Sequence, residues 1–113
     1  MSEPISARVV DTSAITAFAS DGAQAPLLLE SEDVTALLLC LEPGQGVGPC
    51  RMDRAVLYYV IAGRGRLRME DESEHLVAGT LAMAPAGAVR SIVAGERMRV
   101  LAVQIHPAQG RNV

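Results

Sequence analysis

Short apolar segments recur along this chain, separated by residues that favour turns. Gly, Pro, Asp and Ser supply most of these separators, and no stretch of ten or more residues keeps a helical period. Strands at such spacing, with turn signals between them, are typical of a β-sandwich or a β-barrel. The sequence therefore predicts an all-β fold, with strands at 27–30, 34–41, 55–61, 66–70, 75–77, 80–83, 89–93 and 97–105.

The length and composition fit a single domain. The chain has 113 residues, of which 50% are hydrophobic, so it can bury one core. Aromatic residues make up only 3%, so that core is expected to be aliphatic. Residues 1–26 are an N-terminal extension with weak patterning, in which we expect a short strand at 9–10 and a helical turn at 13–18.

Charge and hydropathy argue against several classes of protein. No apolar run approaches the roughly 18–20 residues that a membrane-spanning helix needs, and the N-terminus lacks the features of a secretory signal. We therefore expect a cytoplasmic protein with no membrane partner. The formal net charge is -3, and the 10 basic residues are all arginines scattered along the chain, so no nucleic-acid partner is expected.

One hairpin is predicted near the middle of the chain. Residues 55–62 lead through Gly63 and Gly65, which are expected to supply positive φ angles, into a strand at 66–70. The acidic residues that follow predict a solvated turn; a cation site is the alternative, but no EF-hand spacing supports it. The Gly- and Pro-rich stretch 43–49 is expected to be a loop.

Two frameworks of glycine and proline give the chain a resemblance to a known family. The segment PGQGVGPCRMDRAVLYYVIAGRG resembles the first cupin motif, with Gly44 and Gly63 at its two glycine positions. The segment GTLAMAPAGAVRSIVA resembles the second motif, with Gly79, Pro85 and Gly87 in the expected places. The resemblance covers about residues 34–105. It implies a single cupin domain, folded as a double-stranded β-helix, or jelly-roll, barrel.

The metal-ligand positions of that family are substituted in this chain. Metal-binding cupins hold a divalent ion with three histidines and a glutamate, and the corresponding positions here are Cys50, Met52, Val56 and Arg90. Valine cannot ligate a metal, and arginine carries a positive charge that repels one. We therefore expect no metal and no other cofactor. A copper site is the competing hypothesis, because the thiol and the thioether are soft ligands that Met83 or His106 could complete.

The alignment of the chain with the two cupin motifs also defines a candidate ligand pocket. Side chains alternate along a strand, so alternate positions should face the barrel interior. Arg90 is expected to be the fixed charge there, with a carboxylate or phosphate of a small organic ligand as its partner. The alternative is a rim position at which Arg90 pairs with a surface carboxylate. The sequence does not decide whether Gln104 and His106, on the predicted strand 97–105, face the barrel interior or the outside. The predicted pocket residues are Cys50, Met52, Val56, Tyr58 and Arg90.

Three large apolar residues should face away from that interior. Leu57, Tyr59 and Ile61 alternate with the inward positions and need cover from another surface. The preferred interpretation is a homodimer, in which a partner subunit supplies that cover. The alternative is cover from the N-terminal segment of the same chain.

Three functions fit these residues. The first is a metal-free barrel that binds a small organic ligand, in a non-catalytic or regulatory role. The second is a metal-independent isomerase or lyase that uses Tyr58, Cys50 or His106 as its acid, base or nucleophile. The third is a metalloenzyme with relocated ligands, although the chain has only two histidines. The sequence assigns no catalytic residue and favours the first function.

Overall fold

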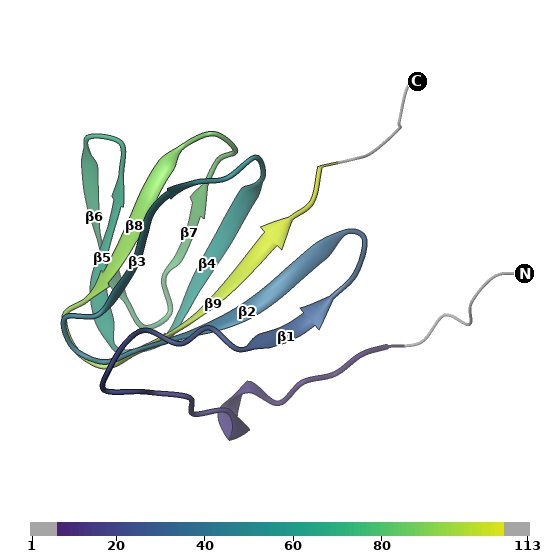
Figure 1. Cartoon of the computed structure of the whole chain (residues 1–113), viewed down its shortest axis with the longest axis horizontal. Helices are drawn as coiled ribbons and strands as arrows, with labels where there is room; N and C mark the ends of the chain where they lie inside the picture. Colours follow the sequence, from purple (N-terminus) through teal and green to yellow (C-terminus); the bar gives the residue numbers. More distant parts are fainter. Residues whose placement is uncertain (1–6, 108–113) are drawn as a thin grey trace, which may run out of the picture.

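The computed structural model describes residues 7–107. Within this range the chain forms nine β-strands and one short 3-10 helix (Figure 1). The elements are η1 (Thr12–Ala14), β1 (Leu27–Glu30), β2 (Val34–Leu41), β3 (Gly46–Arg51), β4 (Ala55–Ala62), β5 (Arg64–Met69), β6 (Glu72–Val77), β7 (Leu81–Ala84), β8 (Val89–Ala94) and β9 (Met98–Ile105).

The strands form two antiparallel sheets that face each other. Sheet A has the order β1-β2-β9-β4-β7, and sheet B has the order β3-β8-β5-β6 (Figure 1). The strand order is far from the chain order in both sheets, because the chain passes repeatedly from one sheet to the other. This arrangement confirms the predicted all-β jelly-roll architecture.

The core lies between the two sheets and is built almost wholly from aliphatic side chains. On β4 the alternation is clear, since Val56, Tyr58 and Val60 are buried whereas Tyr59 is 42% exposed. Burying one such aliphatic side chain contributes about 1.5–3 kcal/mol. Buried residues from both sheets complete the cluster, namely Leu39, Leu41, Leu67, Leu76, Ala84, Ile92, Ala94, Met98, Val100 and Ala102.

The predicted hairpin at 55–70 is wrong. Strands β4 and β5 lie in different sheets, and the chain crosses from one to the other at Gly63. Gly63 has a φ of 84°, and a Cβ there would collide with the carbonyl of Arg97. Gly65 has no positive φ; it lies within β5, where a Cβ would collide with the carbonyl of Val93. The true hairpin joins β5 to β6, and its acidic turn is exposed as expected.

A second correction concerns the stretch 43–49, which was expected to be a loop. Strand β3 begins within it, at Gly46, and pairs with β8 along the edge of sheet B. Pro49 is compatible with this placement because an edge strand leaves one side unpaired. Pairing with β8 thus overrides the turn-forming composition, and the register shifts once, between Val47 and Cys50.

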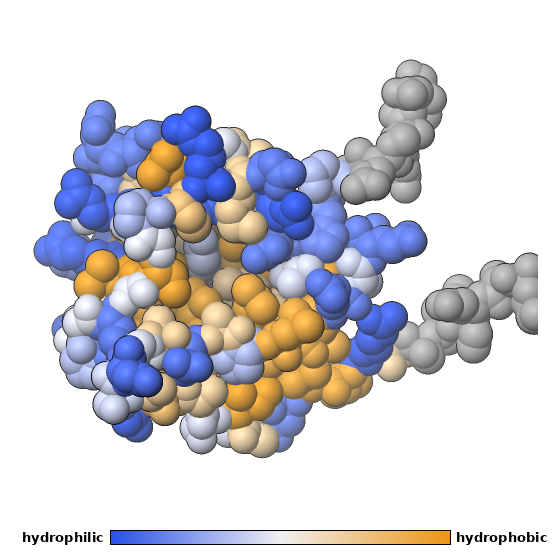
Figure 2. All heavy atoms as spheres, in the orientation of Figure 1, coloured by the Kyte–Doolittle hydropathy of each residue, from blue (hydrophilic) through white to orange (hydrophobic). Residues whose placement is uncertain are grey.

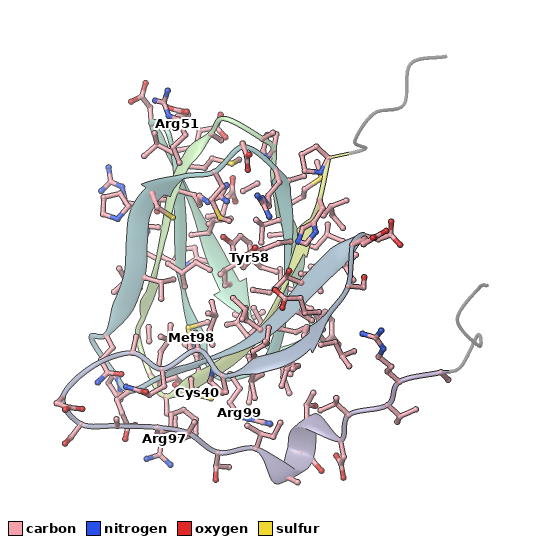
Figure 3. The ribbon with its side chains drawn as sticks, turned by 45° about the vertical axis from the view of Figure 1, so that its right-hand side comes forward. Cys40, Arg51, Tyr58, Arg97, Met98 and Arg99 are labelled. Atoms are coloured by element: carbon pink, nitrogen blue, oxygen red, sulfur yellow. The ribbon has the colours of Figure 1, made fainter. Side chains whose placement is uncertain are left out.

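The N-terminal segment lies against the outer face of sheet A. The predicted strand at 9–10 does not form, and the helical turn is limited to η1. Arg99, on β9, donates hydrogen bonds from Nη2 to the carbonyls of Thr12 and Ile15. Figure 3 shows Arg99 and Cys40 at the end of the barrel along which this segment runs. The outward side chains of Leu38 and Cys40 on β2 are fully buried at this side of the sheet.

Candidate functional site

Arg90 is the charged group inside the barrel. It lies on β8, where Arg90, Ile92 and Ala94 are buried and Val93 is 46% exposed, so its side chain points between the sheets. The residue is only 2% exposed. Its Nε, Nη1 and Nη2 atoms are all buried, and none of them has a hydrogen-bond partner among residues 7–107.

A buried arginine without a partner lowers the stability of the folded chain. A guanidinium cannot shed its charge by deprotonation, and a buried, uncompensated charge costs several kcal/mol. The alternative of a rim position paired with a surface carboxylate does not fit, because no carboxylate within the described residues forms an ion pair with Arg90. The interior therefore holds a positive charge that forms no hydrogen bond or ion pair with any described residue.

Tyr58 is the polar neighbour of Arg90. It lies on β4 with 6% exposure, and Figure 3 shows it in the space between the sheets. Burial raises the pKa of Tyr58, and the charge of Arg90 and the approach of its guanidinium to the phenol oxygen offset part of that rise. The phenol is therefore neutral near pH 7 and can donate its proton in a hydrogen bond to an acceptor beside the guanidinium. The approach of the guanidinium does not reach the distance and angle of a hydrogen bond, so its three nitrogens have no partner by geometry.

The two sulfur-bearing positions lie at the edge of this interior. Cys50 is the register partner of Arg90 across the β3–β8 pair, so both side chains belong to the same face of sheet B. Because β3 is an edge strand, Cys50 is exposed and not enclosed by the barrel wall. Met52 is half-buried and packs against the core, and Val56 is 2% exposed within it.

Three polar side chains lie near Val56 in sheet A, of which Gln104 and His106 were considered from the sequence and Thr35 was not. Gln104 pairs with Val56 and with Thr35, so its side chain takes the inward face that was left open. Thr35 is 8% exposed and lies 2.7 Å from Nε2 of His106, measured from its hydroxyl oxygen. Nδ1 of His106 lies 3.0 Å from the carbonyl oxygen of Glu32. A carbonyl only accepts, so Nδ1 carries the proton and Nε2 accepts from Thr35.

These residues do not fit a divalent metal. A buried valine and an unpartnered guanidinium occupy two of the four positions where the resemblance would place metal ligands. Residues 7–107 contain no group of three or more His, Cys, Asp or Glu side chains that could hold an ion. The copper hypothesis loses one of its two completing ligands, because Met83 is 54% exposed and lies on the outward face beside Leu57. The other, His106, has both ring nitrogens in contact with protein atoms, the Thr35 hydroxyl and the carbonyl of Glu32.

Four arginines share the outer face of sheet B, because alternate positions of β5 and the end of β3 point outward. They are Arg51, Arg64, Arg66 and Arg68. A groove of about 560 Å³ on this face is lined in part by Arg64, Arg66 and His75. It lies on the opposite side of the sheet from the Arg90 guanidinium.

No helix in the described part of the chain is long and apolar enough to cross a membrane.

Figure 2 shows polar residues over much of the surface and an apolar area over the region where Figure 1 places β1 and β2. Leu27, on β1, is 55% exposed.

Comparison with known proteins identifies the fold. No protein-family model and no curated sequence matches the chain. A cupin superfamily protein from Desulfitobacterium hafniense matches with a TM-score of 0.78 and 21% identity, over 92% of this chain and 94% of that chain. A protein with a double-stranded β-helix domain from Klebsiella pneumoniae matches with a TM-score of 0.80 and 19% identity, over 88% and 90%.

A third solved structure agrees with these two. A conserved protein of unknown function from Streptococcus pyogenes matches with a TM-score of 0.79 and 20% identity, over 93% of this chain and 92% of that chain. The chain therefore has the double-stranded β-helix fold of a small cupin domain, as the motif resemblance predicted. At this level of identity the likeness establishes the fold alone.

Proposed function

We propose that this protein binds a small organic anion inside the barrel, with Arg90 as its counter-ion. The observation that carries the proposal is the Arg90 guanidinium, which is 2% exposed and has no hydrogen-bond partner at any nitrogen within residues 7–107. An anion would convert this uncompensated charge into a charge-assisted, bidentate interaction. The role is non-catalytic or regulatory.

The chemistry around Arg90 indicates what kind of anion would fit. A single guanidinium neutralises one negative charge, so a monocarboxylate suits it better than a phosphate dianion. Tyr58 adds a hydroxyl beside the guanidinium, and Gln104 adds an amide on the inward face of sheet A. The core side chains of the two sheets are aliphatic, and most small-molecule sites are likewise lined by apolar side chains. The proposed ligand is therefore a carboxylate with an apolar body.

The alternative of a metal-independent isomerase or lyase has less support. His106 was its best candidate base, but both ring nitrogens are engaged, with Thr35 and with the carbonyl of Glu32. A general base needs a free lone pair directed at the substrate. The cytoplasmic location expected from the sequence remains a prediction.

Thermal unfolding in the presence of named anions tests the proposal. We expect benzoate or butyrate to raise the Tm of the wild type, because a ligand at 100 times its Kd adds about 2.7 kcal/mol to the free energy of unfolding. Inorganic phosphate is the parallel probe. Arg90→Met should abolish the shift, whereas Arg66→Met, which removes an outward-facing arginine, should keep it. A shift that survives in Arg90→Met, or no shift with any probe, would contradict the proposal.

We also propose that the protein forms a homodimer through the outer face of sheet A. The side chains that face outward from β4, β7 and the second half of β9 are all apolar, and Tyr59, Leu81 and Met83 are 42%, 64% and 54% exposed. The N-terminal segment, which was the alternative cover, bonds to Arg99 instead. A face without charges can pair with its own copy without burying an ion.

Sedimentation of the wild type and of Leu81→Glu tests this interface. We expect the wild type to sediment as a dimer and Leu81→Glu as a folded monomer, because two carboxylates would meet at the two-fold interface. Arg51→Glu, on the outer face of sheet B, is the control and should stay dimeric. A wild type that is monomeric at all concentrations would end this proposal.

A further inference from the structure

Cys50 is an exposed thiol beside the unpartnered charge. The chain has two cysteines, and Cys40 is fully buried whereas Cys50 is exposed on the edge strand β3. An exposed thiol alone indicates nothing about function. What distinguishes Cys50 is its register partner, Arg90, which is 2% exposed and bonded to no described residue.

The register places the two side chains beside each other on one face of sheet B. Val47 pairs with Ile92 and Cys50 pairs with Arg90, so three residues of β3 span the distance of two residues of β8. The extra residue in the bulge keeps both Val47 and Cys50 on the inward face. Directly opposite residues in an antiparallel pair have Cβ atoms about 4.5–5.5 Å apart.

Tyr58 provides an independent sign of the same proximity. Burial raises its pKa, and the charges of Arg90 and Cys50 then act on it in opposite directions. The thiol, the phenol and the guanidinium therefore lie close enough to interact electrostatically at one place, although they come from three different strands.

We propose that Cys50 is a redox modification site, whose oxidation by hydrogen peroxide to a sulfinate gives Arg90 a tethered anion and closes the barrel to other anions. The inference rests on the proposed function, because it regulates the same guanidinium. In the reduced protein Arg90 is free for a ligand, and in the oxidised protein the sulfinate takes the ligand's place.

The chemistry needs two molecules of peroxide. The sulfur of Cys50 attacks one peroxide oxygen, the O–O bond breaks, and sulfenic acid and water form. The sulfenic sulfur attacks a second peroxide in the same way and gives sulfinic acid and a second water. Sulfur loses two electrons in each step, and peroxide is reduced. The sulfinic acid then releases its proton to solvent, and its two oxygens pair with the guanidinium.

Carboxylate substitution tests the contact without oxidation. Cys50→Asp places a permanent anion at this position, and Cys50→Asn is its neutral match of nearly the same shape. We expect Cys50→Asp to unfold at a Tm roughly 4–8 °C above that of Cys50→Asn. In an Arg90→Met background that difference should vanish, because the anion then has no partner.

Peroxide treatment tests the modification itself. We expect a mass gain of about 32 Da on the peptide that contains Cys50 and none on the buried Cys40. The oxidised wild type should have a higher Tm and should lose the thermal shift with benzoate. Cys50→Ser is the control and should keep that shift after the same treatment. Oxidation of the Cys50 peptide that leaves benzoate binding unchanged would overturn the inference.

The two proposals fail in different ways. If Cys50→Asp is no more stable than Cys50→Asn, the sulfinate model is wrong, and anion binding by Cys50→Asn still supports the proposed function. If no anion shifts either the wild type or Cys50→Asn, the proposed function is wrong. A difference between the two variants that depends on Arg90 would still support the contact between residues 50 and 90.

Discussion

Arg90 and Arg99 both lie on strands that pair with a neighbour on each side, but their guanidinium groups differ in their hydrogen-bond partners. Arg99 points outward from β9, and its Nη2 donates to the carbonyls of Thr12 and Ile15 in the N-terminal segment. Arg90 points inward from β8, and no described residue accepts from it. The chain thus satisfies Nη2 of Arg99 with its own backbone, whereas Nε of Arg99 and all three nitrogens of Arg90 have no hydrogen-bond partner among the described residues.

A third arginine shows the ordinary surface case. Arg97 precedes β9 and makes a bidentate ion pair with Glu42, with Nε and Nη2 each 2.8 Å from a carboxylate oxygen. The hydrogen bond from Arg97 lowers the pKa of Glu42. Of these three arginines, Arg90 alone is both buried and without any partner among the described residues. Burial by itself therefore does not decide whether the charge of an arginine is compensated, because compensation depends on its partners.

The largest expected effect comes from Arg99→Met. The substitution removes the donor for two carbonyls and frees the N-terminal segment from sheet A. We expect a loss of about 2–4 kcal/mol in the free energy of unfolding, measured by urea denaturation. Cys40 should then react with a thiol reagent under native conditions, giving two reactive thiols per chain instead of one.

Arg64→Met is the control for that variant. It removes an exposed arginine that pairs with Glu96 and should cause a smaller loss, because a surface ion pair contributes little. It should also leave Cys40 unreactive. Equal effects of the two substitutions would mean that Arg99 does not hold the N-terminal segment.

A smaller effect of opposite sign is expected for Arg90→Met in ligand-free buffer. Replacing a buried, unpaired charge with an apolar side chain of similar length should raise the free energy of unfolding by about 1 kcal/mol. Urea denaturation without added carboxylate measures it. A loss as large as that of Arg99→Met would show that Arg90 has a structural partner, and the contrast between the two arginines would disappear.

Much of the barrel could be predicted, because its signals are local. Alternation marked the buried face of β4, and Gly and Pro marked most of the turns. Two errors had one origin. Strand β3 looked like a loop, and β4 and β5 looked like a hairpin, since partners distant in sequence decide which segments pair. Local composition does not contain that information.

For the candidate site, the sequence supplied positions along the chain but not the surroundings of each side chain. Motif spacing placed Cys50, Met52, Val56, Tyr58 and Arg90 in one region, and the structure brings them to the interior or its open edge. Spacing did not reveal that Cys50 is exposed, which follows from the edge position of β3. It also missed Thr35 and its contact with His106, because the two residues are 71 positions apart.

The sequence by itself determined the class of fold and the substituted metal positions, because strand periodicity and turn chemistry are properties of neighbouring residues. Only the tertiary structure decided which arginine has partners. The contact of Arg99 with the N-terminal segment spans 84 and 87 positions, and the isolation of Arg90 depends on every strand that faces it. Whether a charge is compensated is a property of the three-dimensional surroundings.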